Sequence, residues 1–310
     1  MKKLAILGAF FALLLAAVPV FAKPGKGAKV CHLPDDYTTI QDAIEDTECV
    51  KIIVGSGEWD GALVDRPVEI TSEGNAIINN GPAHSSGLIQ GFRLLAGSDG
   101  TIISHLQFEV DFPVMNGEGV DNVTISHNSM INSIQGVSNW VGSNWSINHN
   151  DIRDLRTRCG GGIGILVGSF TGNSANDNVI SHNDISGTLF VDPNDCGGYN
   201  GTGIVLYADY RWGRNGGPLT GNRVVNNKVS LVSDTPDLVN VVAIELTDTR
   251  DDENIHDIVG NAIGFNDLRG TTEQIALTPS NLDESNDISR NLGDNRGHGL
   301  HPSLFGPGGM

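Results

Sequence analysis

The chain has 310 residues, a formal net charge of −18 and only 6% aromatic residues. This excess of acidic residues disfavours nucleic acid and anionic membrane surfaces as partners, because both repel a negatively charged protein. Glycine accounts for 40 residues, which suits a chain with many tight corners and does not suit one built of long helices.

The first 22 residues have the features of a cleavable export signal. Two lysines precede an apolar run from Leu4 to Val18, and Val20–Ala22 has the small-x-small pattern of a peptidase site, cut after Ala22. The run is short for a spanning helix, and Pro19 ends it. We therefore expect a secreted or periplasmic protein with no membrane span once residues 1–22 are removed.

The segment after the signal predicts a linker and then a short capping helix. Residues 23–36 begin with Gly and Lys and offer little to bury, so we expect the folded domain to cover residues 37–295 and a loosely ordered tail to follow over 296–310. Thr38 and Gln41 form a capping box, and Ile40, Ala43 and Ile44 share one helical face. Such a helix would cover the open end of a solenoid.

A recurring phrase predicts the architecture between these ends. Each copy has alternating apolar residues, a polar pair and a closing asparagine. The shortest step between closing asparagines is 22 residues, too short for a βαβ unit and typical of a solenoid. An antiparallel sandwich is the alternative, although its strands need not share one phrase. The closing asparagines are Asn128, Asn150, Asn183, Asn227, Asn266 and Asn291.

The closing asparagines suggest two structural roles. Asn tolerates the left-handed conformation, so we expect each one to form a one-residue corner. Stacked asparagines can also pass amide hydrogen bonds along the solenoid axis. A second apolar strand lies between the phrases, which gives each rung at least two strands. These second strands are expected at residues 164–167, 203–207, 243–246 and 274–277.

The stretch from Tyr37 to Ile78 carries the order Thr-Ile-Gln-x-Ala-Ile, an Ile-Val strand ending in Gly, an aromatic residue, Val-Glu-Ile-Thr and Ala-Ile-Ile. This order resembles the entry to the pectin-lyase-like superfamily, which includes pectin methylesterases and periplasmic NosD-type proteins. With the asparagine phrases, the resemblance covers roughly residues 37 to 292. It implies an all-β, single-stranded right-handed parallel β-helix, and the crossover rule favours the same hand. No specific enzyme family is matched.

Four cysteines in an exported chain allow three disulfide pairings. Cys31 and Cys49 bracket the capping helix, whereas Cys159 and Cys196 lie just upstream of the second strand in consecutive rungs, about 4.8 Å apart. We therefore expect the pairs Cys31–Cys49 and Cys159–Cys196. A metal site is the alternative, but the spacing contains no CxxC unit.

The loops that flank the second strand contain clusters of arginines and aromatic residues. Arginines can hold carboxylates and aromatic rings can stack on sugars, so we expect a groove along this strand to bind an acidic polysaccharide. The alternative is ordinary solvated loops with internal salt bridges. The candidate ligand-binding residues are Arg153, Arg156, Arg158, Tyr207, Tyr210, Arg211, Trp212 and Arg214.

The sequence gives only a weak indication of enzymatic activity. A polysaccharide lyase or C5-epimerase acting on uronic acid chains is favoured over a glycoside hydrolase, and a non-catalytic structural or surface-interaction β-helix is the alternative. Residues 190–195 resemble the Asp-Pro-His-Asp motif of alginate C5-epimerases, although Asn194 stands in place of the histidine; the alternative is an ordinary Pro-Asn-Asp turn. Ca²⁺ is the one candidate cofactor, and we expect a monomer. The candidate acid, base or Ca²⁺-binding residues are Asp192, Asp209, Asp248, Asp251 and Asp252.

Four histidines recur with the phrase. His105, His127, His149 and His182 are 22, 22 and 33 residues apart and are expected to form a column along the solenoid. The column is either a site for Cu or Zn or a solvent-exposed repeat position that prefers Ser-His-Asn.

Overall fold

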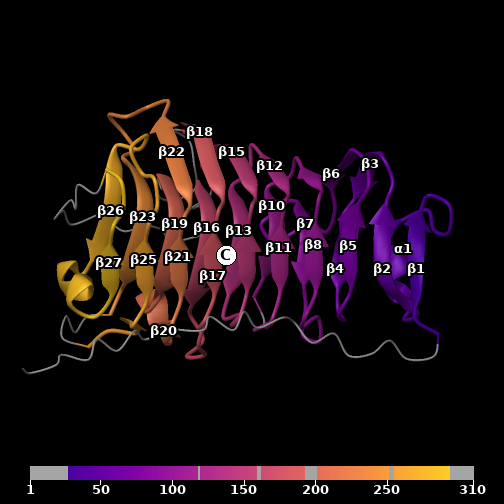
Figure 1. The fold of residues 1–310 in the computed structure, drawn as a ribbon, viewed down its shortest axis with the longest axis horizontal. Helices are drawn as coiled ribbons and strands as arrows, with labels where there is room; N and C mark the ends of the chain where they lie inside the picture. The colour runs from indigo at the N-terminus through magenta and orange to yellow at the C-terminus, as the bar shows by residue number, and fades with distance from the viewer. Residues whose placement is uncertain (1–26, 118, 159–161, 193–200, 251–254, 294–310) are drawn as a thin grey trace, which may run out of the picture.

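The computed structural model describes residues 27–117, 119–158, 162–192, 201–250 and 255–293. Three long parallel sheets run side by side along one elongated body, and the described strands follow one another from one end of it to the other (Figure 1). Strands that are neighbours in a sheet come from successive rungs of the chain. The expected fold class, an all-β parallel β-helix, is confirmed.

Three sheets form the walls of the helix. The ten-stranded sheet has the order β1 (Lys29–Leu33), β2 (Cys49–Val54), β5 (Glu69–Ser72), β8 (Ile102–Ser104), β11 (Thr124–Ser126), β14 (Ser146–Asn148), β17 (Val179–Ser181), β21 (Arg223–Val225), β25 (Ala262–Gly264) and β27 (Asp287–Ser289). The seven-stranded sheet contains β3 (Gly57–Asp60), β6 (Ala76–Asn80), β9 (Gln107–Phe108), β12 (Ser129–Ile131), β15 (Asp151–Arg156), β18 (Asp184–Phe190) and β22 (Lys228–Ser233). The eight-stranded sheet contains β4 (Ala62–Val64), β7 (Gln90–Leu94), β10 (Phe112–Asn116), β13 (Gln135–Trp140), β16 (Ile163–Ser169), β19 (Gly201–Ala208), β23 (Val241–Asp248) and β26 (Glu273–Thr278).

The core is built from apolar side chains that repeat at the same register in each rung. In the ten-stranded sheet, one inward position holds a branched aliphatic residue in nine consecutive strands, and each is buried. Parallel register stacks these side chains in a single column along the axis. The column consists of Ile52, Ile70, Ile103, Ile125, Ile147, Ile180, Val224, Ile263 and Ile288.

The expected second strands are confirmed as β16, β19, β23 and β26. The structure adds a third strand to most rungs, which begins directly after the closing asparagine and belongs to the seven-stranded sheet. A further pair, β20 (Leu219–Thr220) and β24 (Ile258–Val259), forms a small two-stranded sheet. Each full rung is therefore triangular, and its first corner consists of two residues, such as His127 and Asn128 between β11 and β12.

The closing asparagines form the expected hydrogen-bonded ladder, but the expectation that they are the left-handed residues of the corner is wrong. Asn128 Nδ2 donates to Asn150 Oδ1 at 3.0 Å, and Asn150 Nδ2 donates to Asn183 Oδ1 at 3.0 Å. The left-handed residue comes one position earlier, with φ 57° at His127 and 54° at His149. The turn at this residue directs the next side chain inward, where a buried amide can bridge rungs.

The N-terminal end is covered by the expected helix, with two corrections at its boundaries. Helix α1 (Ile40–Glu45) begins at the N-cap Thr39, whose hydroxyl accepts a hydrogen bond from Asp42 N at 3.0 Å, so the cap is not Thr38 with Gln41. Its buried face is formed by Ile40, Ala43 and Ile44, as expected. Strand β1 lies inside the segment expected to be a linker, because alternate side chains of Lys29–Leu33 pack on the core.

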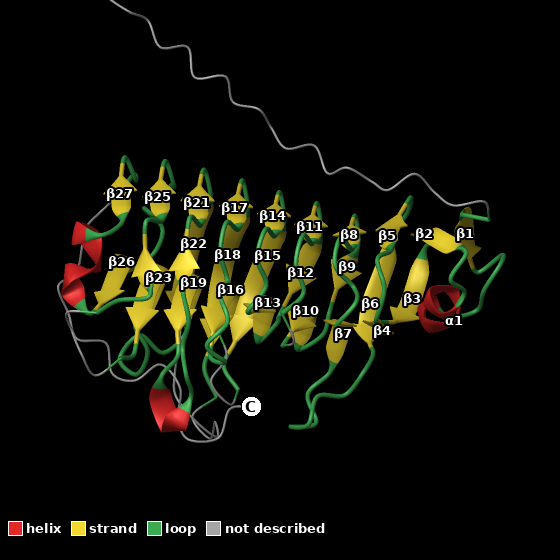
Figure 2. Cartoon of the chain, turned by 90° about the horizontal axis from the view of Figure 1, so that it is seen from below, coloured by secondary structure: helices red, strands yellow, loops and turns green. Residues whose placement is uncertain are grey.

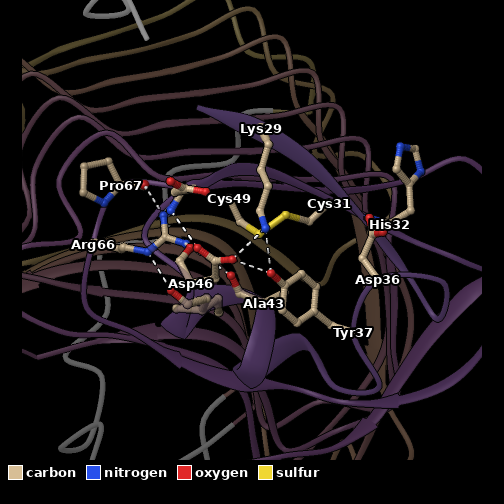
Figure 3. Close-up of a disulfide and its surroundings, with 12 residues drawn as sticks. Lys29, Cys31, His32, Asp36, Tyr37, Ala43, Asp46, Cys49, Arg66 and Pro67 are labelled. Carbon is tan, nitrogen blue, oxygen red and sulfur yellow. Dashed lines mark hydrogen bonds and ion pairs between the residues drawn. A yellow bond between two sulfur atoms is a disulfide. The ribbon is translucent and has the colours of Figure 1, made fainter. Parts of the chain in front are cut away.

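The disulfide Cys31–Cys49 is confirmed, with the two Cα atoms 5.7 Å apart (Figure 3). It joins β1 to β2, and Tyr37, Asp46 and Lys29 form a hydrogen-bonded cluster beside it. Cys159 and Cys196 lie outside the described residues, so their pairing stays a prediction. Within the described ranges, no helix is long and apolar enough to cross a membrane.

Candidate functional site

The chain leaves β19 and enters a compact loop that is anchored by a buried carboxylate. Asp209 is fully buried and accepts hydrogen bonds from Arg211 Nε at 3.0 Å and from an Arg214 guanidinium nitrogen. Burial alone would raise the pKa of Asp209, but the two guanidiniums outweigh it and hold this pKa below its usual range. Asp209 is therefore an ionised anchor for both arginines.

Trp212 is held outward by this anchor. It lies in the short turn η1 (Arg211–Gly213), at φ 53° and ψ 36°, and its side chain is 53% exposed. The turn projects beyond the end of the eight-stranded sheet (Figure 2). The guanidinium carbons of Arg211 and Arg214 lie 4.4 and 5.2 Å from the Trp212 ring centroid, within the range of cation–π attraction.

A second cluster lies beside the first, on the loop after β23. Arg250 pairs with Asp257 at 2.6 Å, and the Tyr210 hydroxyl hydrogen-bonds to both. The Arg250 guanidinium also covers the Tyr210 ring at 4.5 Å. Burial, followed by the nearby Asp257 carboxylate, raises the pKa of Tyr210 to about 12. Tyr210 therefore stays protonated and rigidly placed at neutral pH.

Asp248 connects the two ends of the loop after β23. Its carboxylate accepts hydrogen bonds from the backbone N–H groups of Arg250 at 3.0 Å and Asp257 at 2.8 Å. Burial raises the pKa of Asp248, and these two hydrogen bonds oppose the rise without cancelling it. The Asp248 side chain is almost entirely buried, so the main effect of these hydrogen bonds is to fix the conformation of the loop.

Tyr207 is buried, in contrast to its expected place in a binding groove. Its ring packs edge-on against Trp140 with centroids 6.1 Å apart, and burial raises its pKa. The Arg211 guanidinium covers the ring at 5.2 Å. Tyr207 therefore supports Arg211 from below and does not present its ring to solvent.

The remaining arginines lie on β15 of the seven-stranded sheet and on the segment after it, at the opposite end of the eight-stranded sheet from Trp212. Arg153 and Arg156 belong to β15, and Arg158 follows it before β16 begins. Strand β16 has seven residues, so this group lies roughly 20 Å from the loop after its end. Arg153 pairs with Asp151 at 2.5 Å and Arg156 with Asp111. The structure does not bring this group together with Trp212.

The candidate carboxylates do not form a common site among the described residues. Asp209 and Asp248 are committed to the contacts above, and Asp192 is exposed at the end of β18. Asp251 and Asp252 lie outside the described residues. Within the described ranges, no group of three or more His, Cys, Asp or Glu residues is placed to hold a metal ion.

The comparisons with known proteins agree with the absence of a specific family match. No protein-family model matches the chain, and no match was found among curated proteins. Solved structures similar to this chain include the catalytic domain of a GH87 alpha-1,3-glucanase with nigerose, at 14% identity, covering 90% of this chain and 70% of that chain with a TM-score of 0.35.

Two other similar structures are lyases by name. An alginate lyase from Paenibacillus sp. str. FPU-7 has 14% identity, covers 83% of this chain and 95% of that chain, and has a TM-score of 0.35. A PL6 family polysaccharide lyase, Pedsa3628 from Pseudopedobacter saltans, has 14% identity, 84% and 91% coverage and a TM-score of 0.23. Similarities at this level carry no information on what this chain binds.

Proposed function

We propose that this chain is an exported, monomeric protein that binds an acidic polysaccharide at the loops after β19 and β23, with one sugar ring stacked on Trp212. The observation that carries the proposal is the exposed Trp212 ring, fixed by two guanidiniums that are themselves anchored on the buried Asp209. A rigid aromatic face loses little conformational entropy when a sugar ring stacks on it. The disulfide Cys31–Cys49 supports export, because such bonds persist in oxidising compartments.

The preference for acidic chains is supported by the local charge balance. Among the described residues, Arg211 and Arg214 both pair with Asp209, so two guanidinium groups lie beside Trp212 in a protein whose formal charge is −18. A local reversal of the field attracts anions that the rest of the surface repels. The second cluster is more acidic, since Arg250 lies between Asp248 and Asp257. The anionic group of the ligand should therefore lie nearer Arg214 than Arg250.

A polysaccharide lyase or C5-epimerase is the second candidate. The raised pKa of Asp248 is the kind of shift found in groups that transfer protons. Incubation with polygalacturonate or alginate tests this candidate. Absorbance from an unsaturated uronate would support a lyase, and a change in uronate stereochemistry would support an epimerase. If neither signal appears while binding is retained, the protein is a non-catalytic glycan-binding β-helix.

The binding test uses two matched aromatic substitutions. Trp212→Asn removes the proposed platform, and Phe265→Asn is the control, because Phe265 is 54% exposed, has φ 60° and lies 5.2 Å from the Arg290 guanidinium. At neutral pH we expect Trp212→Asn to weaken binding of polygalacturonate oligomers about tenfold or more. Phe265→Asn should bind polygalacturonate oligomers as tightly as the parent protein does. For a neutral glucan, Trp212→Asn should cause no tenfold loss of affinity. Equal binding by both variants and the parent protein would refute the proposal.

A further inference from the structure

A ladder of four imidazoles runs along an exposed corner of the β-helix, far from the loops after β19. His105, His127, His149 and His182 stack with ring centroids 5.0, 4.9 and 4.9 Å apart and interplanar angles of 3°, 0° and 3°. All four are exposed and lie at φ values of 54° to 58°. The backbone therefore sets the spacing of the rings at one rung each. We call this set the histidine ladder.

The same corner position continues beyond the ladder with different residues. The next three rungs place Asn226, Phe265 and Arg290 there, at φ 57°, 60° and 61°. Arg290 covers the Phe265 ring at 5.2 Å. The column therefore ends in a permanent positive charge, and Asn226 shows that the corner accepts a neutral side chain.

The surface around the histidine ladder carries little opposing charge. On the side of the ten-stranded sheet, the residues just before the four histidines are Ser104, Ser126, Asn148 and Ser181, and none is charged. On the side of the seven-stranded sheet, the positions two residues after the histidines are Gln107, Ser129, Asp151 and Asp184.

The two aspartates of this set already have cationic partners. Arg153 pairs with Asp151 at 2.5 Å, and Lys228 pairs with Asp184 at 2.9 Å. Glu73 shares a shallow hollow of about 420 Å³ with His105 and His127, and it is the one further carboxylate that lines this hollow. Most of the ladder is thus free of uncompensated negative charge.

Imidazole is the side chain whose charge changes between about pH 5 and 8, so it suits a site whose charge follows the pH. Burial, followed by the neighbouring His127 and His182, lowers the pKa of His149. His149, inside the histidine ladder, therefore takes up its proton only in more acidic solution than an isolated imidazole does.

We propose that the histidine ladder is an acid-gated binding site for an extended polyanion that lies parallel to the helix axis, with about one carboxylate per imidazole. An acidic polysaccharide is the occupant of matching form, because it repeats one carboxylate per sugar ring along a straight chain. This choice of ligand class rests on the proposed function, whereas the charge and geometry of the ladder do not. The site lies on a different corner from Trp212, so each site has its own pH dependence.

The test measures binding of a labelled polygalacturonate oligomer at about pH 5 and about pH 7.5, where uronate carboxylates with pKa values near 4 stay ionised. EDTA is present so that metal bridges between imidazoles do not contribute. We expect binding to tighten about tenfold or more in acid, because several close charge pairs are added. His127→Asn/His149→Asn should lose this gain and keep the affinity measured at about pH 7.5. Asn is used because Asn226 occupies the same corner.

A gain-of-function variant provides the converse measurement. Asn226→His extends the histidine ladder by one rung and should increase the gain in acid. Trp212→Asn should still bind more tightly in acid than at neutral pH, although its affinity at neutral pH is lower. The histidine-ladder proposal and the Trp212 proposal can therefore fail independently. The ladder proposal is overturned if the double histidine variant keeps the gain, if the parent protein shows none, or if Trp212→Asn abolishes it. A folded state common to all variants is checked by circular dichroism.

Discussion

The Oδ1 atom of Asn183 accepts two hydrogen bonds from Asn150, one from its side-chain Nδ2 and one from its backbone N–H, both at 3.0 Å. The Nδ2 group of Asn183 in turn donates to Ile147 O and to Asn227 Oδ1, both at 2.9 Å. One buried side chain thus satisfies polar groups in both neighbouring rungs.

Asn183→Ala is therefore expected to destabilise the protein strongly. It leaves buried donors and an acceptor without partners, at about 1 to 3 kcal/mol for each group that stays unpaired. Urea denaturation followed by circular dichroism measures the loss. Asn173→Ala is the control, since Asn173 is exposed in a loop and should change stability little. If Asn183→Ala and Asn173→Ala lowered the free energy of unfolding by similar amounts, the stacked asparagines would contribute no special stability.

Asp209→Asn should destabilise the loop that carries Trp212. It leaves Arg211 and Arg214 next to a neutral, buried amide, and breaking a buried ion pair costs about 3 to 5 kcal/mol. The control is Asp267→Asn, which breaks an exposed pair with Arg269 and should cost about 0 to 1 kcal/mol. Trp212 fluorescence and denaturant midpoints report the effect. An unchanged midpoint for Asp209→Asn would contradict the anchoring role of this carboxylate.

Stability should decline as pH falls below about 6.5, in part because of His149. The folded-state pKa of His149 is lowered by burial and by His127 and His182, so the unfolded chain binds the proton more tightly. Its contribution is complete above about pH 6.5 and is lost as pH falls through the folded value. Asp209 and Asp267, whose pKa values are lowered, lose their contributions only below about pH 4, outside this window.

Thermal unfolding measured at about pH 7.5 and about pH 5.5 checks the sign of this effect. The parent protein should melt at a lower temperature in the more acidic buffer, and His149→Asn should narrow the difference. A melting temperature that rises on acidification, or a difference that His149→Asn does not change, would contradict the prediction.

Replacing both Cys31 and Cys49 by alanine should loosen the N-terminal end first. The disulfide closes a loop with a sequence separation of 18 residues, for which the expected stabilisation is about 3 kcal/mol. Neighbouring rungs hold the rest of the solenoid, so the loss should be local. Hydrogen exchange should rise in β1, β2 and α1 and stay unchanged near β21. A uniform rise along the chain would show that the protein unfolds as a single unit.

The fold could be predicted from the sequence because its determinants are local and periodic. One inward apolar position recurs in each rung and one closing asparagine in each rung from β11 onward, and parallel stacking follows from their regularity. The corner assignment was wrong by one residue, because Asn also favours the left-handed conformation that His127 adopts here. The backbone preference of asparagine did not reveal that its side-chain amide is buried and bridges neighbouring rungs.

The candidate site could be predicted only in part. Trp212, Arg211 and Arg214 are neighbours in sequence and lie together. Two partners of other candidate residues come from distant segments: Asp111 pairs with Arg156 across 45 residues, and Asp257 accepts a hydrogen bond from Tyr210 across 47. No local pattern indicates Asp257 as part of the site, so sequence reasoning overestimated the free positive charge.

The shortest rung has a consequence for the growth of this molecule. Asn128 and Asn150 occupy equivalent positions 22 residues apart, and everything between them forms one closed turn of the helix. Residues 128–149 are thus a self-contained module, whose duplication would lengthen the body by about 4.8 Å without disturbing register. Each copy would add Met130, Val137, Trp145 and Ile147 to the core and one imidazole to the exposed corner. The number of such modules sets the length of the histidine ladder, and therefore the length of the polyanion that the proposed site can bind.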